Sequence, residues 1–173
     1  ALQRRQDELF LDADDGGWFS TTGRDASVLL RLKEDYDGAE PAASSVSVLN
    51  LLTLSHLVHD EAFEQSIDRT FGMFAQRIAQ SGRTVPMMMA ALSTYHAGMS
   101  QIVIAGERAG AETRALMDVV RRRYLPFAVM VPLGIRDSGF GIRDPGAIAR
   151  LLPWTEAMAN RTHQPTAYVC RDF

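Results

Sequence analysis

The hydrophobic pattern of this chain changes near Gly98, and that change constrains the fold more than any other feature. Before Gly98, apolar residues recur at the steps of three and four residues that are typical of α-helices. After it, short apolar runs of the β-strand type alternate with one clear helix. We therefore predict a mainly α protein, with helices and a β-ribbon in residues 1–98 and a small appended α/β subdomain in residues 99–173.

Three helices joined by short loops are predicted in the first part. The first begins with Ser44 or Ser45 as its N-cap and is apolar on more than half of its circumference, which predicts burial between neighbours. The second follows Asp60, a potential N-cap, and ends at Gly82; the third opens at Pro86. Short connections favour antiparallel packing of consecutive helices.

Strands are predicted on both sides of Gly98. In the first part, Trp18–Thr22 and Val28–Leu32 have the composition of two short strands and form a hairpin-like ribbon. In the second part, three apolar runs predict strands at residues 101–105, 127–131 and 166–170. A helix between the first two runs completes a βαβ unit, so we expect a three-stranded parallel sheet.

The composition excludes several classes of protein. The net charge of −3 favours neither nucleic acid nor an anionic membrane as partner, and no apolar run approaches the roughly 20 residues of a membrane span. The one cysteine, Cys170, fits a reducing compartment, so we expect a cytoplasmic protein. No glycine-rich nucleotide fingerprint occurs, and no third ligand follows His56 and His59, so no cofactor or metal is predicted.

Four stretches of the sequence together resemble one family. They are Asp15-Gly-Gly-Trp-Phe19, Lys33-Glu-Asp-Tyr-Asp-Gly-Ala39, the helix start from Pro41 to Leu52, and Thr166 to Phe173. The chain resembles the C-terminal part of the thioredoxin-domain-containing family that includes the spermatogenesis-associated thioredoxin-like protein. The resemblance implies antiparallel helical hairpins from an (α/α)6 toroid, a fold related to N-acylglucosamine 2-epimerases, preceded by a thioredoxin-like domain. The family usually carries Asn where this chain has Ser44.

The resemblance also implies partners for this chain. The front of the toroid and the thioredoxin-like domain have no counterpart in these 173 residues, so the chain reads as a fragment whose partners are those parts. Three helices cannot close a toroid, and their uncovered apolar faces predict self-association.

Two polar loops in the first part are candidates for a functional site. Trp18 or Phe19 can stack on a sugar ring while the Asp15 carboxylate accepts hydrogen bonds from its hydroxyl groups. The alternative is a tight turn that buries both rings. The second loop, Lys33 to Asp37, offers carboxylates for acid and base roles, and Lys33 could orient an anionic group. The alternative for this loop is a solvated segment with local ion pairs.

The resemblance favours a role for both loops in lining the cavity. The predicted catalytic residues are Asp15, Glu34 and Asp37, and the predicted substrate-binding residues are Trp18, Phe19, Lys33, Tyr36 and Ser44. Two functions follow. The first is binding of a sugar-like molecule, or acid–base catalysis on it, in a central cavity. The second is a non-catalytic scaffold that works with the thioredoxin-like domain.

Overall fold

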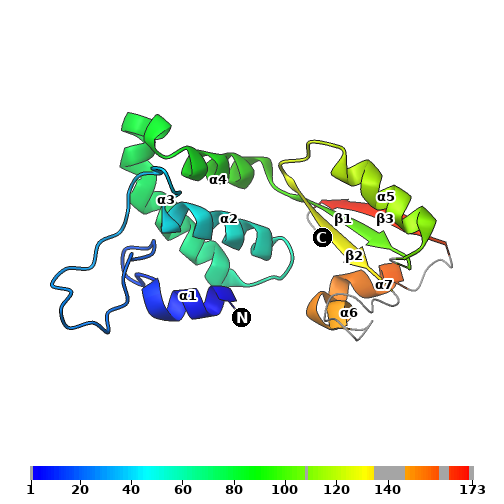
Figure 1. Ribbon diagram of the computed structural model, residues 1–173, viewed down its shortest axis with the longest axis horizontal. Coiled ribbons are helices and arrows are strands. Elements are labelled where there is room, and N and C mark those ends of the chain that lie inside the picture. The colour runs from blue at the N-terminus through cyan, green and yellow to red at the C-terminus, as the bar shows by residue number, and fades with distance from the viewer. Residues whose placement is uncertain (1, 108, 135–146, 160–163, 172–173) are drawn as a thin grey trace. The chain divides into compact units, whose positions relative to one another are not determined.

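The change of pattern near Gly98 separates two sets of elements in the computed structural model, which describes residues 2–107, 109–134, 147–159 and 164–171 (Figure 1). The first unit comprises Ala1–Ser55 with His59–Ala97, and the second comprises His56–Val58 with Gly98–Phe173. Three residues between two helices of the first unit thus belong to the second. In the described part of the chain, no helix is long and apolar enough to cross a bilayer.

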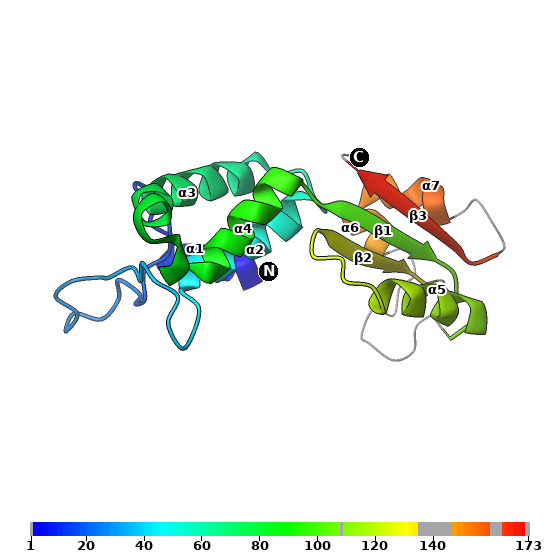
Figure 2. The same ribbon diagram turned by 90° about the horizontal axis from the view of Figure 1, so that it is seen from above.

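The first unit is helical. Its elements are α1 (Leu2–Phe10), α2 (Ala43–Ser55), α3 (Glu61–Ser81), a 3₁₀ turn (Gly82–Thr84) and α4 (Pro86–Ala97). Helix α2 contacts both α3 and α4, and Figure 2 shows these three elements from above. Because two helices cover it, α2 can be apolar on nearly every side, which confirms the predicted burial.

The helix ends follow the predicted signals only in part. The backbone N–H of Ala62 donates to Asp60 Oδ1 at 3.0 Å, so Asp60 caps α3 as predicted. Gly82 has φ −51°, a right-handed conformation, and begins the 3₁₀ turn instead of closing α3 as a left-handed glycine. Helix α2 begins at Ala43, so the prediction that Ser44 or Ser45 is its N-cap was wrong.

The core of the first unit joins all of its helices. Phe74 of α3 is 1% exposed, and Phe10 of α1 packs against the same cluster. The fully buried members are Trp18, Val48, Leu51, Leu52, Ile67, Phe74, Val85, Met88 and Ala91. A residue from the N-terminal loop, Trp18, thus belongs to the same core as the three helices.

The predicted β-ribbon is absent from residues 18–32, all of which the structure describes. Between the two predicted strands the backbone forms one hydrogen bond, of 2.8 Å from Ser20 N to Leu32 O, and Trp18 forms an isolated bridge with Leu11 instead. Leu29 and Leu30 are 99% and 72% exposed, so no apolar surface covers the second predicted strand, Val28–Leu32. A lone two-stranded ribbon is marginal in water, which explains why strand-like composition was not sufficient.

The second unit is an α/β sandwich around a three-stranded sheet. Its elements are β1 (Ser100–Ala105), α5 (Ala111–Arg121), β2 (Ala128–Leu133), α6 (Ala147–Leu151), a 3₁₀ turn (Pro153–Thr155), α7 (Glu156–Ala159) and β3 (Thr166–Arg171). The strand order is β2-β1-β3. β1 and β2 pair in parallel with Ser100 opposite Ala128, which confirms the βαβ unit.

The prediction of an all-parallel sheet was wrong, because β3 runs antiparallel to β1. Ser100 lies opposite Arg171, and Ala105 lies opposite Thr166. Residues of β3 alternate between half-buried and exposed, as in an edge strand with one solvated face, a pattern common in antiparallel pairs. The connection from β2 to β3, residues 134–165, is longer than the dozen residues that a parallel crossover needs, so the sequence alone left both directions open.

Both faces of the central strand β1 are covered (Figure 1). Ile102 and Ile104 of β1 pack with Met117 of α5, whereas Val103 and Ala105 face the side of α6 and α7. This arrangement explains why β1, the central strand, is apolar without alternation, since both of its faces are buried.

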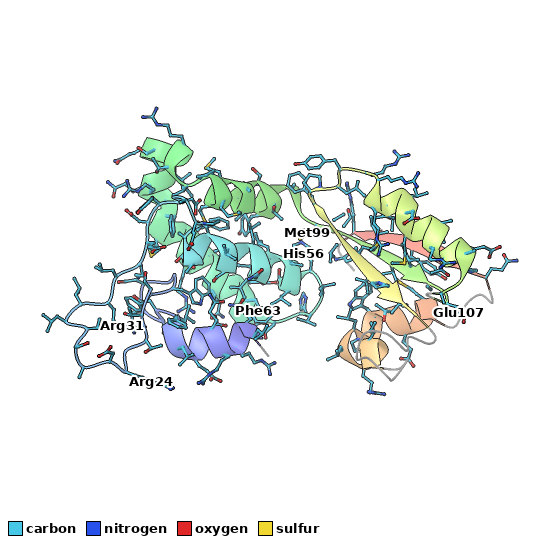
Figure 3. The ribbon with its side chains drawn as sticks, viewed as in Figure 1. Arg24, Arg31, His56, Phe63, Met99 and Glu107 are labelled. Carbon is cyan, nitrogen blue, oxygen red and sulfur yellow. The ribbon has the colours of Figure 1, made fainter. Side chains whose placement is uncertain are left out.

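The segment His56–Val58 is fastened to the second unit by hydrogen bonds. Met99 N donates to His56 Nε2 at 3.2 Å, and the buried Gln101 side chain donates to the His56 carbonyl at 2.9 Å (Figure 3). The Trp154 indole N–H donates to the Leu57 carbonyl at 3.0 Å. Polar groups on β1 and the 3₁₀ turn therefore bind backbone that leaves α2.

We expect Phe74→Ala to destabilise the first unit by about 3–5 kcal/mol, because it empties a fully buried aromatic site. Urea titration followed by circular dichroism and by Trp18 fluorescence in a Trp154→Phe background, which leaves the core of the first unit unchanged, would report on the first unit. The control Val119→Ala removes an exposed side chain and should change stability by less than about 0.5 kcal/mol. Equal loss in both variants would contradict the assigned core.

Candidate functional site

The double glycine of the first loop is a turn that packs closely on α3. Gly16 and Gly17 have φ of +80° and +75°, a region that favours glycine. A Cβ atom at Gly16 would lie 2.9 Å from the backbone carbon of Arg69, and the Gly17 N–H donates to Thr70 Oγ1 at 3.1 Å. The turn therefore serves close packing against α3.

Trp18 lies in the core and not at the rim of a cavity. It is 1% exposed, its backbone N–H donates to Ser44 Oγ at 3.0 Å, and its indole N–H donates to Asp7 Oδ1 at 2.9 Å. Neither face of its ring is accessible to a ligand in this arrangement. Trp18 and Ser44, both predicted to bind substrate, are thus hydrogen-bonded to each other. Trp18 lies in a tight, buried turn, which was the alternative to a sugar-binding loop.

Phe19 is half-buried and lies beneath two cations. The guanidinium carbon of Arg31 is 3.9 Å from the centre of its ring, and Lys33 Nζ is 5.2 Å from it. Arg31, labelled in the loop of Figure 3, also donates to the Thr21 carbonyl at 2.9 Å. These cation–π contacts and hydrogen bonds fix the loop after Phe19.

Lys33 is neutralised inside the unit. Its ammonium donates to Asp12 Oδ2 at 2.8 Å and to the Gly16 carbonyl at 3.0 Å. The hydrogen bond from Lys33, joined by those from the backbone N–H groups of Asp15 and Asp14, holds the pKa of Asp12 below its ordinary value of 3.8. The anion that Lys33 binds in the described structure is therefore Asp12.

Asp37 joins two helix starts. Its Oδ1 accepts from Ala42 N at 2.9 Å, directly before α2, and its Oδ2 accepts from Met87 N at 2.8 Å and Met88 N at 3.3 Å in the first turn of α4. Its own N–H donates to the Thr84 carbonyl at 2.8 Å. A carboxylate at this position satisfies free N–H groups and complements the α4 dipole, as an N-cap does.

The remaining predicted site residues are exposed. Asp15, Glu34 and Tyr36 all lie on the surface of the two loops, and Tyr36 is 58% exposed. Asp35, between Glu34 and Tyr36, forms an ion pair with Arg77 of α3. These residues are the part of the predicted set that a ligand could reach in this structure.

The two loops meet at Lys33, which binds Asp12 and Gly16 of the first loop, but Asp15 and Asp37 lie beside anchors at different places along α3. The Gly16 turn contacts Thr70, whereas Asp37 is bound to Thr84 just beyond Ser81, the last residue of α3. At a rise of 1.5 Å per residue, Thr70 and Ser81 are about 16 Å apart along the helix. The two carboxyl groups of a glycosidase lie only about 5–9.5 Å apart, so these anchors do not favour a pair made from Asp15 and Asp37.

Several residues with structural roles at this site were missed from the sequence. Asp7 and Asp12 bind Trp18 and Lys33, and Thr70 binds the glycine turn. The only signal for these roles in the sequence was a polar side chain, on a helix for Asp7 and Thr70 and at a turn for Asp12. Among the described residues, no group of three or more His, Cys, Asp or Glu side chains is arranged to hold a metal ion.

We expect Asp37→Ala to destabilise the first unit by about 2–3 kcal/mol, because three N–H groups at two helix starts lose their acceptor. Asp37→Asn, which keeps one oxygen acceptor, should cost less. The exposed Glu34→Ala is the matched control and should change the free energy of unfolding by under about 0.5 kcal/mol. Equal effects of Glu34→Ala and Asp37→Ala in urea titration would contradict the capping role.

We expect the Asp12–Lys33 pair to make stability fall in acid. Because the pKa of Asp12 is lowered on folding, its contribution is fully present above its ordinary value of 3.8 and is lost as pH falls through the lower, folded value. Asp12→Asn should cost about 1–3 kcal/mol at pH 7 and flatten the dependence below pH 4. Thermal melts from about pH 2 to 7 would measure this; parallel curves for both proteins would contradict it.

The comparisons with known proteins point to one family. The chain is 35% identical to Spermatogenesis-associated protein 20 of Homo sapiens over 172 residues, which cover 99% of this chain and 21% of the human protein. It is 33% identical to the protein of the same name from Rattus norvegicus over 169 residues, which cover 97% of this chain and 20% of that protein.

This chain spans about one fifth of the length of the curated relatives that it matches. No family model matches the chain. No solved structure matches it either. Nearly all of this chain is thus similar to one segment of longer proteins, and these similarities support its membership of the family of Spermatogenesis-associated protein 20.

Proposed function

We propose that this segment is a non-catalytic scaffold module of a larger protein. The observation that carries the proposal is the use of Asp37, whose two carboxylate oxygens accept three backbone hydrogen bonds at the starts of α2 and α4. A carboxylate held in this way has little freedom to move protons to and from a substrate.

The other residues singled out in the sequence support the same proposal. Trp18 and Ser44 bind each other inside the core, and Lys33 is paired with Asp12. Aromatic and charged residues in these loops therefore stabilise the helices, which is the role expected of a scaffold. In this proposal the role of the two loops is to hold the helices of the first unit together.

The resemblance gives the scaffold its proposed context. In the longer protein the helical unit would form part of an (α/α)6 toroid, and the toroid would present clients to a thioredoxin-like domain that precedes it. The second unit would then be an appended α/β element. The carbohydrate hypothesis stays a prediction, and the exposed residues Asp15, Glu34 and Tyr36 are the ones on which it now depends.

We expect no sugar to raise the melting temperature of this chain. A panel of neutral, amino and acidic monosaccharides at about 10 mM, above the millimolar dissociation constants of weak ligands, would be screened by thermal shift and confirmed by titration calorimetry. Any sugar that binds would then be tested against Glu34→Gln and Asp15→Asn. Their exposed side chains can be changed without loss of the fold, so a binding defect in these variants is separable from unfolding.

Two outcomes distinguish the proposed functions. Binding that disappears in Glu34→Gln but persists in Asp35→Asn, which breaks only the ion pair with Arg77, would overturn the scaffold proposal in favour of a sugar site. Absence of binding both by this chain and by the longer protein that contains it is the result expected of a scaffold.

A further inference from the structure

Formal charge is segregated between the two units. The residues of the first unit include eight Lys and Arg and fourteen Asp and Glu, whereas those of the second include ten and seven. The first unit therefore carries a net charge of −6 and the second +3, which together give the −3 of the chain. A difference of this size between two units favours electrostatic association between surfaces of opposite sign.

The positive charge is concentrated in one exposed segment that begins at the last residue of α5 and continues beyond it, which we call the basic surface. It consists of Arg121, Arg122, Arg123, Tyr124, Leu125 and Phe127, all of which are exposed. Tyr124 is 91% exposed. The segment mixes guanidinium groups with aromatic and aliphatic side chains, the composition that is enriched at protein interfaces.

The backbone of the basic surface is fixed at both ends. Arg122 N and Arg123 N each donate to a helix carbonyl at 3.1 Å, and Ser100 N donates to the Phe127 carbonyl at 2.9 Å. Arg121 forms a local ion pair with Asp118 at 3.7 Å, which leaves Arg122 and Arg123 as the guanidinium groups to recognise a partner. A surface held in this way loses little backbone entropy on binding.

The first unit carries a matching surface of negative charge, which we call the acidic stripe. Glu61, Glu64 and Asp68 are exposed and lie three and four residues apart, on one face of α3. Over seven residues the stripe is about 10 Å long. The Tyr95 hydroxyl donates to Asp68 at 3.1 Å, and this hydrogen bond, with the charges of Asp68 and Glu64, raises the pKa of Tyr95.

We propose that the basic surface of one copy of this chain docks on the acidic stripe of a second copy. Arg122 and Arg123 would bind the Glu61 and Glu64 carboxylates, an arrangement that suits the planar guanidinium group. Charge complementarity favours this partner over nucleic acid, because the chain as a whole is negative and its acidic stripe would repel phosphates. Because two short surfaces bury little area, the association is weak and depends on salt.

The test is the molar mass of the intact chain in sedimentation equilibrium at low and high salt. At about 20 mM salt the mass should rise with protein concentration, and at about 500 mM, where the Debye length is only a few ångströms, it should fall to that of a monomer. Arg122→Glu/Arg123→Glu should weaken the association at least tenfold, as should Glu61→Arg/Glu64→Arg. A mixture of the two variants should associate again, because the reversed surfaces are complementary.

The matched control is Arg24→Glu/Arg83→Glu, which changes the net charge by the same amount at exposed positions of the first unit. It should leave the association in place, and circular dichroism should show all variants folded. A wild-type monomer at every concentration and salt, association that neither reversal weakens, or no recovery on mixing would overturn the proposal. Binding of a single-stranded oligonucleotide by a monomeric chain would overturn it in favour of a nucleic-acid surface.

Discussion

The burial of Trp18 is the constraint on which the first unit depends. Its side chain fills the core between helices, while its indole N–H requires an acceptor that Asp7 of α1 supplies. Its backbone N–H binds Ser44 of α2, and the glycine preceding it binds Thr70 of α3. One short stretch thus ties three helices together, and a buried donor left without its acceptor would cost more than the contact gains.

Asp37 ties α4 to the loop in a similar way, by accepting hydrogen bonds from its first turn. The loop between residues 19 and 42 has no regular secondary structure, so it must be held by side chains. Arg31, Lys33 and Asp37 do this in turn, the first two by covering Phe19 and the third by capping α4. Loops with many charged residues are often interpreted as sites, but here most of the charges satisfy backbone groups or one another.

The second unit obeys a different constraint, which is the coverage of a small sheet on both faces. β1 lies between a parallel and an antiparallel neighbour, and helices cover each side. The unit also takes His56–Val58 from the connection between α2 and α3, through hydrogen bonds from Met99, Gln101 and Trp154. Its surplus of arginine lies at the end of α5 and directly after it, at exposed positions that take no part in covering the sheet.

The sequence by itself determined the helices α2 to α5, the three strands of the second part and the βαβ unit, because periodicity, caps such as Asp60 and apolar runs are local signals. It did not predict α6 and α7, which are only five and four residues long. It did not determine the direction of β3, because a short apolar run that follows a connection as long as residues 134–165 fits either direction. The predicted ribbon at 18–32 is absent because its second strand, Val28–Leu32, has no apolar surface to cover it, although Trp18 in the first is buried in the core.

The roles of the loop residues also depended on the tertiary structure. Asp37 and Glu34 look alike in the sequence, yet one caps two helices and the other is exposed. A side chain's chemistry is local, but its partners come from residues as far as fifty positions away, as Met87 is from Asp37. The sequence thus determined which groups were present, and only the tertiary structure decided which of them were already engaged.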